Sequence, residues 1–160
     1  MNTTYPLSSP LSQKQKTVWS LLHKGFSVSA IADKLSTTRQ YINQTKLTAE
    51  AKLSTTLLDV AGANDIQVTK LYPKKAILLG YHPALNRKAI ITYTTSHGIK
   101  VWYWHDNPET ITNQAFLQQT RKYLLDIANE QGLEFEDTGD IHPAKLAHII
   151  FSKLVPEVQS

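Results

Sequence analysis

The stretch Ser27-Val-Ser-Ala-Ile-Ala-Asp-Lys-Leu-Ser-Thr-Thr-Arg-Gln-Tyr-Ile-Asn-Gln-Thr-Lys46 decides the fold of the first third of this chain. Ile31, Ala32 and Leu35 follow helical spacing, so they share one face of a short helix. Ile42 falls where a second helix would pack back on the first, and Ala32 is small enough for two crossing helices to approach. The pattern predicts a helix-turn-helix.

The turn of this motif is the hydroxyl-rich run Ser36-Thr-Thr38, in which Ser36 stands where a glycine is usual. Hydroxyl side chains are common N-caps, so the second helix is expected to start near Thr38. Its outward side chains are of the kinds that read base edges, and we expect base contacts from Arg39, Gln40, Asn43 and Gln44. Hydroxyl groups, ammonium groups and helix N-termini bind phosphate, and we expect phosphate contacts from Ser27, Lys34, Thr37, Thr38 and Lys46.

A further helix is predicted before the motif, over residues 11–26. Ser12 is a suitable N-cap and Gly25 a suitable C-terminal stop. We expect Val18, Leu21 and Leu22 to face inward, with Trp19 at the edge of that stripe. The three helices together form a more specific pattern than a helical hairpin alone.

The pattern Leu11-Ser-x-Lys-Gln-x-x-Val-x-x-Leu, followed by Gly25-Phe-Ser, Ile31-Ala-Asp-Lys-Leu and Thr37-Thr-Arg-x-x-Ile, resembles the helix-turn-helix of the LuxR-type and sigma-factor region 4 group. Within that group it is most similar to the archaeal Tfx-type transcriptional regulators, whose Thr-Ser-Arg-Ala-Asn-Val-Ser segment resembles Thr37–Asn43. The resemblance covers residues 11–58. It implies a tri-helical fold whose helix starting near Thr38 enters the major groove of DNA.

Charge is concentrated in the same third of the chain. Residues 1–58 contain seven Lys or Arg and two Asp or Glu, a net charge of +5, whereas residues 59–160 contain ten and eleven, a net of −1. Contacts with phosphates supply most of the sequence-independent affinity of DNA-binding proteins. The distribution therefore agrees with DNA binding by the first third, although lysine-rich faces also serve solubility.

Composition restricts the class of protein. With 41% hydrophobic and 19% charged residues, the chain is expected to be globular. It contains no cysteine and no run of about 18 apolar residues, so we expect no disulfide, no thiolate metal site and no membrane span. The first ten residues lack the features of a signal peptide and are predicted to be a flexible arm. We expect a cytoplasmic protein.

The second helix of the motif is predicted to extend toward Gly62, because no glycine or proline intervenes and Ala49, Leu53, Leu57 and Val60 continue its stripe. Such a helix would connect to the next domain or pack against its copy in a partner, and the adjacent leucines at 57 and 58 are compatible with an interface. The alternative is a separate short helix after a kink near Thr48.

Beyond Gly62 the periodicity changes to that of strands. Strands are predicted over residues 66–72, 76–81, 88–94 and 99–104, the last two joined by the turn Thr95–Gly98. A helix is predicted from Asn107 to Gly132 with an inward stripe of Phe116, Thr120, Tyr123, Leu124 and Ile127. A last helix is predicted from Pro143 to Pro156, with Leu146, Ala147, Ile149, Ile150 and Leu154 inward. The acidic run 133–140 is expected to be a solvated loop or edge segment.

The predicted fold class is therefore α+β: a flexible arm (1–10), a tri-helical helix-turn-helix domain with an extended third helix (11–61), and a small antiparallel-sheet domain with two covering helices (62–160). The last domain is expected to serve dimerisation or effector binding. Trp102 and Trp104 would share one face of its sheet, either as a ligand platform or dimer interface, or as core beneath the helices; we favour the core.

No catalytic motif is apparent, and we expect no catalytic site, no cofactor and no metal. The best candidate for metal or acid–base chemistry is the pair of strand ends Tyr81-His82 and His105-Asp106, although histidine at a strand end is usually a surface residue. The leading prediction is a sequence-specific regulator of transcription that binds double-stranded DNA as a homodimer, with any effector unidentified. The alternative is an adaptor that binds a partner protein through the helical unit and the aromatic sheet, without DNA.

Overall fold

The computed structural model of this protein describes residues 9–104, 114–136 and 139–159. These residues form five α-helices, one short 3-10 helix and a four-stranded antiparallel sheet, which confirms the predicted α+β class. In chain order the elements are α1 (Gln13–His23), α2 (Val28–Lys34), α3 (Arg39–Ala63), β1 (Gln67–Tyr72), β2 (Ile77–His82), β3 (Arg87–Thr94), β4 (Gly98–Tyr103), α4 (Gln114–Glu130), α5 (Pro143–Leu154) and η2 (Pro156–Gln159).

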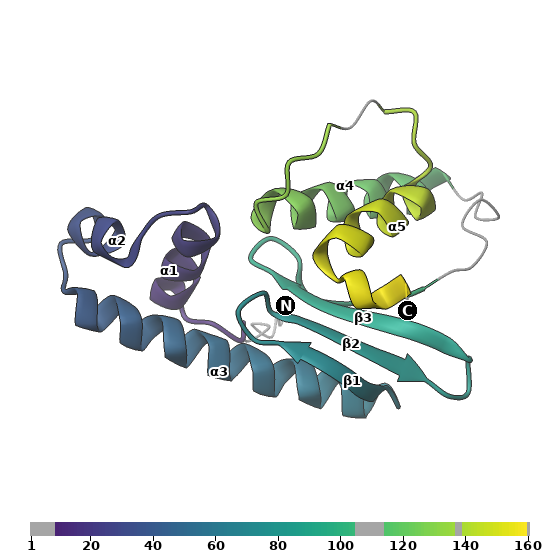
Figure 1. Cartoon of the computed structure of the whole chain (residues 1–160), viewed down its shortest axis with the longest axis horizontal. Coiled ribbons are helices and arrows are strands. Elements are labelled where there is room, and N and C mark those ends of the chain that lie inside the picture. The colour runs from purple at the N-terminus through teal and green to yellow at the C-terminus, as the bar shows by residue number, and fades with distance from the viewer. Residues whose placement is uncertain (1–8, 105–113, 137–138, 160) are drawn as a thin grey trace, which may run out of the picture.

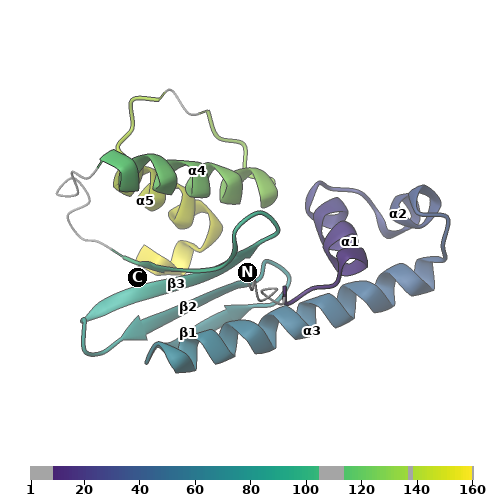
Figure 2. The ribbon, with the colours of Figure 1, turned by 180° about the vertical axis from the view of Figure 1, so that it is seen from behind.

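The sheet lies between two helical layers, with α3 on one face and α4 and α5 on the other (Figures 1 and 2). We call α1, α2 and α3 the head, and the sheet with α4, α5 and η2 the body. α1 and α2 pack on the N-terminal half of α3, which extends beyond the sheet (Figure 1). The two covering helices were predicted; that α3 covers the second face was not.

Serine side chains cap the first two helices of the head; the cap at Ser12 was predicted, and the cap at Ser27 was not. Ser12 caps α1 in a capping box: its Oγ accepts from the Gln15 amide at 3.3 Å, and its own amide donates to Gln15 Oε1 at 2.9 Å. Ser27 caps α2 by accepting from the Ala30 amide at 3.1 Å. Gly25, after the end of α1, has a φ of +92°, a conformation that glycine adopts without strain.

The turn between α2 and α3 also follows the sequence pattern. Ser36 has a φ of +52°, the left-handed conformation that explains why a glycine is usual at this place. Thr38 then caps α3 by accepting from the Tyr41 amide at 3.0 Å. The prediction that Leu35 shares the buried face of Ile31 is wrong. Leu35 follows the last turn of α2 and is 39% exposed.

α3 is one continuous helix of 25 residues, so the predicted alternative of a kink near Thr48 is wrong. Its buried stripe runs from Ile42 through Leu53 to Leu57, each 0% exposed. Leu57 therefore lies in the core under the sheet and offers no surface to a partner, whereas its neighbour Leu58 is 43% exposed.

The sheet is a meander of order β1-β2-β3-β4, with all neighbours antiparallel. The four strands agree with the predicted segments to within a residue or two. β1 is an edge strand with a register shift between Val68 and Lys70, the kind of irregularity that discourages pairing with another chain.

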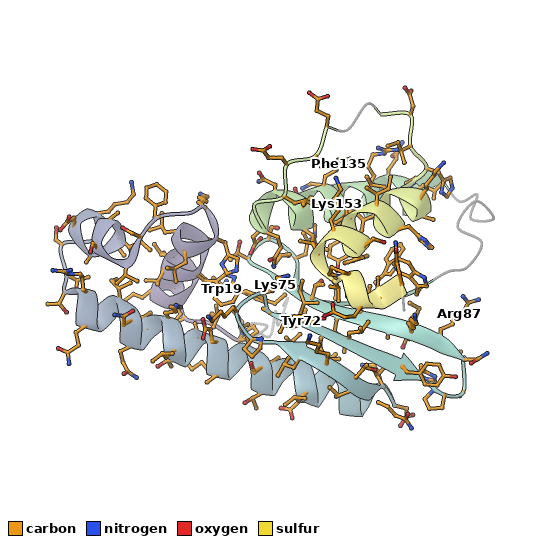
Figure 3. The ribbon with its side chains drawn as sticks, in the orientation of Figure 1. Trp19, Tyr72, Lys75, Arg87, Phe135 and Lys153 are labelled. Carbon is orange, nitrogen blue, oxygen red and sulfur yellow. The ribbon has the colours of Figure 1, made fainter. Side chains whose placement is uncertain are left out.

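The face of the sheet toward α3 shares one hydrophobic core with the head. Leu78 and Tyr93 of the sheet, Leu53 of α3 and Trp19 of α1 belong to the same buried cluster. Trp19 is 2% exposed and meets the Tyr93 ring edge-on at 6.4 Å, between α1 and the sheet (Figure 3). The prediction that Trp19 lies at the edge of the buried stripe is therefore wrong. α1 is buried on two sides: Val18 and Leu21 face α2, and Trp19 faces the sheet. Head and body are held together by this cluster.

The other face of the sheet packs on α4 and α5. Ile77, Ile90 and Trp102 form a core with Leu124 of α4 and Phe151 of α5. The predicted stripes of both helices are found there, except that Ile149 is half-buried and Phe151 takes the inward place. The predicted start of the first of these helices at Asn107 and the side chain of Phe116 lie outside the described residues. In the described part of the chain, no helix combines the length and apolar character needed to cross a membrane.

Candidate nucleic-acid interface

The N-terminal half of α3 is fixed by a small core of its own. Val18 and Leu21 of α1, Ile31 and Ala32 of α2, and Ile42 of α3 form a buried cluster separate from those that contact the sheet. Burial of these side chains orients the opposite side of α3 toward solvent. The three helices thus present a single helical surface on a rigid support.

The predicted base-reading residues lie on that exposed surface. Arg39, Gln40, Asn43 and Gln44 are all exposed, and their i, i+1, i+4, i+5 spacing puts them on neighbouring rows of the helix. Gln44 approaches Thr48 Oγ1 at 3.5 Å, a long contact. Within the described residues, the side chains of the other three form no hydrogen bond or ion pair, so their donors and acceptors are available to a ligand.

The start of α3 adds backbone donors to this surface. The first amide groups of a helix have no intrahelical partner, and the helix dipole is positive at this end. Thr38 satisfies one of these amides, that of Tyr41, and is itself exposed. An anion near Thr38 would therefore meet unused N–H groups as well as the hydroxyl hydrogen.

The remaining predicted phosphate contacts surround this helix start. Ser27 and Lys34 are exposed, whereas Thr37 and Lys46 are half-buried. Ser27 already accepts the Ala30 amide as an N-cap, so only its hydroxyl hydrogen remains for a phosphate. Lys34 lies 5.7 Å from the centre of the Phe26 ring, a cation–π distance.

In the part of the chain that the structure describes, the cations of the head have no acidic partner. Within residues 9–104, 114–136 and 139–159, none of them forms an ion pair. Lys52 donates to Gln15 Oε1 at 3.2 Å, a neutral acceptor that leaves the charge of Lys52 uncompensated. The seven cations of the head are Lys14, Lys16, Lys24, Lys34, Arg39, Lys46 and Lys52.

The structure brings two further residues to this surface that the sequence analysis missed. Lys14 of α1 and Tyr41 of α3 line a cleft of about 470 Å³ between α1 and the turn before α3. Tyr41 is 42% exposed. The sequence signal that could have identified Tyr41 is its place between Gln40, predicted to be exposed, and Ile42, predicted to be buried. That place puts Tyr41 at the side of the helix, between its buried and exposed faces. The cleft is lined by Gln13, Lys14, Thr17, Val18, Leu35, Thr37 and Tyr41.

Trp102 of β4 lies in the core, and Trp104, the residue after the end of β4, packs against that core. Trp102 is 8% exposed and its ring centre lies 6.1 Å from that of Phe151. Trp104 is half-buried and stacks on the His148 ring of α5 at 3.9 Å. The sequence analysis favoured core positions for these two rings. For Trp102 its burial confirms this, so the sheet does not present the Trp102 ring as a platform for a ligand.

The histidine candidates are not assembled into a site in the part of the chain that is described. His82 Nδ1 accepts from the Leu85 amide at 3.1 Å, and the ring meets Tyr103 edge-on at 5.9 Å. His105 and Asp106 lie outside the described residues. Among the residues that the structure describes, no three His, Asp or Glu side chains are grouped so as to hold a metal ion.

Comparison with protein-family models, with curated proteins and with solved structures finds no match to this chain.

Proposed function

We propose that this protein is a sequence-specific regulator of transcription that binds double-stranded DNA with the N-terminal half of α3 in the major groove. The observation that carries the proposal is the exposed row Arg39, Gln40 and Asn43, whose polar groups have no partner within the described residues, on a helix fixed from behind by an apolar core. Arginine pairs with guanine and the carboxamides pair with adenine, through donor and acceptor patterns that only the major groove displays fully.

The dimensions and charges of the head support this proposal. An α-helix with its side chains is about 10–12 Å wide and the major groove about 12 Å. Within the described residues the head cations form no ion pair, and one of them, Lys46, lies on the same half of α3 as the proposed reading face. The N-terminal amides of α3 lie at one end of that face, and both kinds of group bind phosphates. The resemblance of residues 11–58 to the LuxR-type, sigma-region-4 and Tfx-type helix-turn-helix supports the same function.

The proposal includes a homodimer acting in the cytoplasm. One reading helix supplies few contacts, and regulators with such units commonly bind as dimers to half-sites about 34 Å apart. The body is the proposed site of dimerisation or of effector binding.

The proposal is tested by selecting duplexes from a random pool and measuring the affinity of an enriched duplex at increasing salt concentration. If about five phosphates are neutralised, log K falls with log salt at a slope of about −4.5. Lys46→Gln is expected to reduce that slope by about 1, whereas Lys74→Gln, an exposed charge in the body, leaves it unchanged. No duplex binding at low salt would rule out the proposal.

A second candidate is an adaptor that binds a partner protein. The observation in its favour is the cleft beside Tyr41 and Leu35, which exposes apolar surface next to α3. The same experiment separates the two functions, because an adaptor shows no salt-dependent duplex binding, whereas substitutions in the cleft abolish its capture of a partner.

A further inference from the structure

The reading face of α3 does not end with its polar residues. Leu47 is 59% exposed, the most exposed of the large hydrophobic side chains among the described residues. It lies at i+7, i+4 and i+3 from Gln40, Asn43 and Gln44, so it occupies the next turn of the same surface. An apolar side chain thus continues a row that is otherwise built for hydrogen bonding.

The position of Leu47 on this face follows from the continuity of α3. Had the helix kinked at Thr48, Leu47 would be a terminal residue of the reading helix; instead α3 runs on to Ala63. The neighbouring Thr45 and Ala49, 8% and 1% exposed, fix the opposite side of this turn in the core. Leu47 is therefore held outward on the reading face.

Each residue type on this face matches one feature of the base pairs in the major groove. Arginine pairs with the O6 and N7 atoms of guanine, asparagine and glutamine with the N6 and N7 atoms of adenine, and an apolar side chain contacts the methyl group of thymine. From Arg39 to Leu47 the face holds one arginine, three carboxamides and one leucine, with no carboxylate that would accept from cytosine; the next carboxylate along the helix, Glu50, is half-buried.

The order of these residues sets the order of the bases. Arg39 is in the first turn and Leu47 in the third, about 12 Å apart along the helix axis, which spans at most about four base pairs. Arg39 therefore contacts a base pair at one end of the DNA site, and Leu47 contacts a base pair at the other end.

We propose that the duplex read by this helix is A·T-rich, with one G·C pair at the end contacted by Arg39 and a thymine at the other end whose methyl group packs on Leu47. This inference rests on the proposed function and adds the base composition and polarity of the target. Leu47 then determines specificity through the only apolar group that the major-groove edge of a base offers.

The test uses the full-length protein and a duplex enriched from a random pool. Replacing each thymine in turn by deoxyuridine removes one methyl group and leaves every hydrogen-bonding atom in place. At one position the loss is expected to weaken binding by wild type about fourfold, the value of one buried methyl group. Leu47→Ala is expected to bind the parent duplex about fourfold more weakly and to be indifferent to that replacement.

Leu58→Ala is the matched control, since Leu58 is an exposed leucine of the same helix, about 16 Å further along. It is expected to bind like wild type and to keep the methyl dependence. An enriched G·C-rich sequence, or a methyl effect that Leu47→Ala retains, would overturn this inference and leave DNA binding standing. A pool that yields no enriched sequence would overturn the proposed function, and this inference with it.

Discussion

Head and body use their cationic side chains in opposite ways. In the body, counting only bonds between described residues, six of the ten Lys and Arg side chains donate to a carboxylate or a backbone carbonyl of the chain itself: Lys70, Lys75, Arg87, Lys88, Arg121 and Lys122. In the head, within the described residues, none of the seven cations does so. Five of these six join parts of the chain distant in sequence, as Lys75 joins the β1–β2 turn to the end of α5, whereas Lys122 bonds to Asp126 within α4.

This difference separates two uses of the same residue types. A cation bound to a fixed carbonyl contributes to folding, because its removal leaves that carbonyl without its donor. An exposed cation without a partner contributes little to stability but is available to an external anion. Substitutions in the body are therefore expected to change stability, and substitutions in the head to change affinity for DNA.

The largest expected effect concerns the element shared by the two regions. Leu57 of α3 is 0% exposed in the core that joins head and sheet. Leu57→Ala is expected to lower the free energy of unfolding by about 2–5 kcal/mol, through lost burial and a cavity. Because Trp19 belongs to the same cluster, head and body are expected to unfold in one transition.

Urea unfolding followed by circular dichroism and by tryptophan fluorescence measures both expectations. Leu58→Ala, on the exposed side of the same turn, is the control and should leave the midpoint nearly unchanged. Two separate transitions in the wild-type protein would mean that the two regions are independent.

A smaller effect is expected from a body cation. Lys75 Nζ donates to the Leu154 carbonyl at 2.9 Å and lies 5.5 Å from the centre of the Tyr72 ring (Figure 3). Lys75→Met is expected to cost about 1 kcal/mol of stability and to leave duplex binding unaltered. Lys74→Met removes the same charge from an exposed neighbour and should change neither quantity. Thermal unfolding of both variants would refute this if their midpoints fell equally.

The smallest effect is a pH dependence confined to the body. Hydrogen bonds from Tyr72 and Lys70 lower the pKa of Glu157 to about 2, while burial and Glu157 raise the pKa of Tyr72 to about 12. A carboxyl whose pKa falls on folding stabilises the fold above its ordinary pKa of 4.5, and that contribution disappears as the pH falls toward about 2.

Melting temperatures measured across this acid range should therefore fall less steeply for Glu157→Gln than for wild type. Glu136→Gln, an exposed carboxylate in the loop before α5, provides the comparison and should follow the wild-type curve. Parallel curves for wild type and Glu157→Gln would show that the bonds to Glu157 contribute nothing to this dependence.

Local signals predicted most of the elements. The caps at Ser12 and Thr38, the glycine after α1, the turn between β3 and β4 and the change to strand-like periodicity after Gly62 all act over a few residues, so they can be read from the chain directly. Ser36 stands where a glycine is usual, yet its backbone adopts the left-handed conformation that the turn requires.

Features that depend on contacts distant in sequence were missed. Trp19 is buried by α3 and by the sheet, both of which lie outside residues 11–26, so no pattern within that segment reveals its burial. The spacing of Leu35 fits a buried face, yet the helix ends before it. The candidate reading face was largely predictable because helical periodicity determines which side of α3 is exposed, whereas Lys14 and Tyr41 came together only through the crossing of α1 and α3.

The central claim is that the head cations bind DNA, and Arg39→Ala compared with Arg87→Ala tests it most directly. Arg87 Nη1 donates to the Trp104 carbonyl at 3.1 Å, at the end of the sheet far from α1 and α2 (Figure 3). Affinity for a selected duplex and melting temperature would be measured for both variants. The account predicts that Arg39→Ala loses about 1–3 kcal/mol of binding free energy at unchanged stability, and that Arg87→Ala keeps its affinity but melts at a lower temperature. Equal affinities of wild type and Arg39→Ala for that duplex would contradict it.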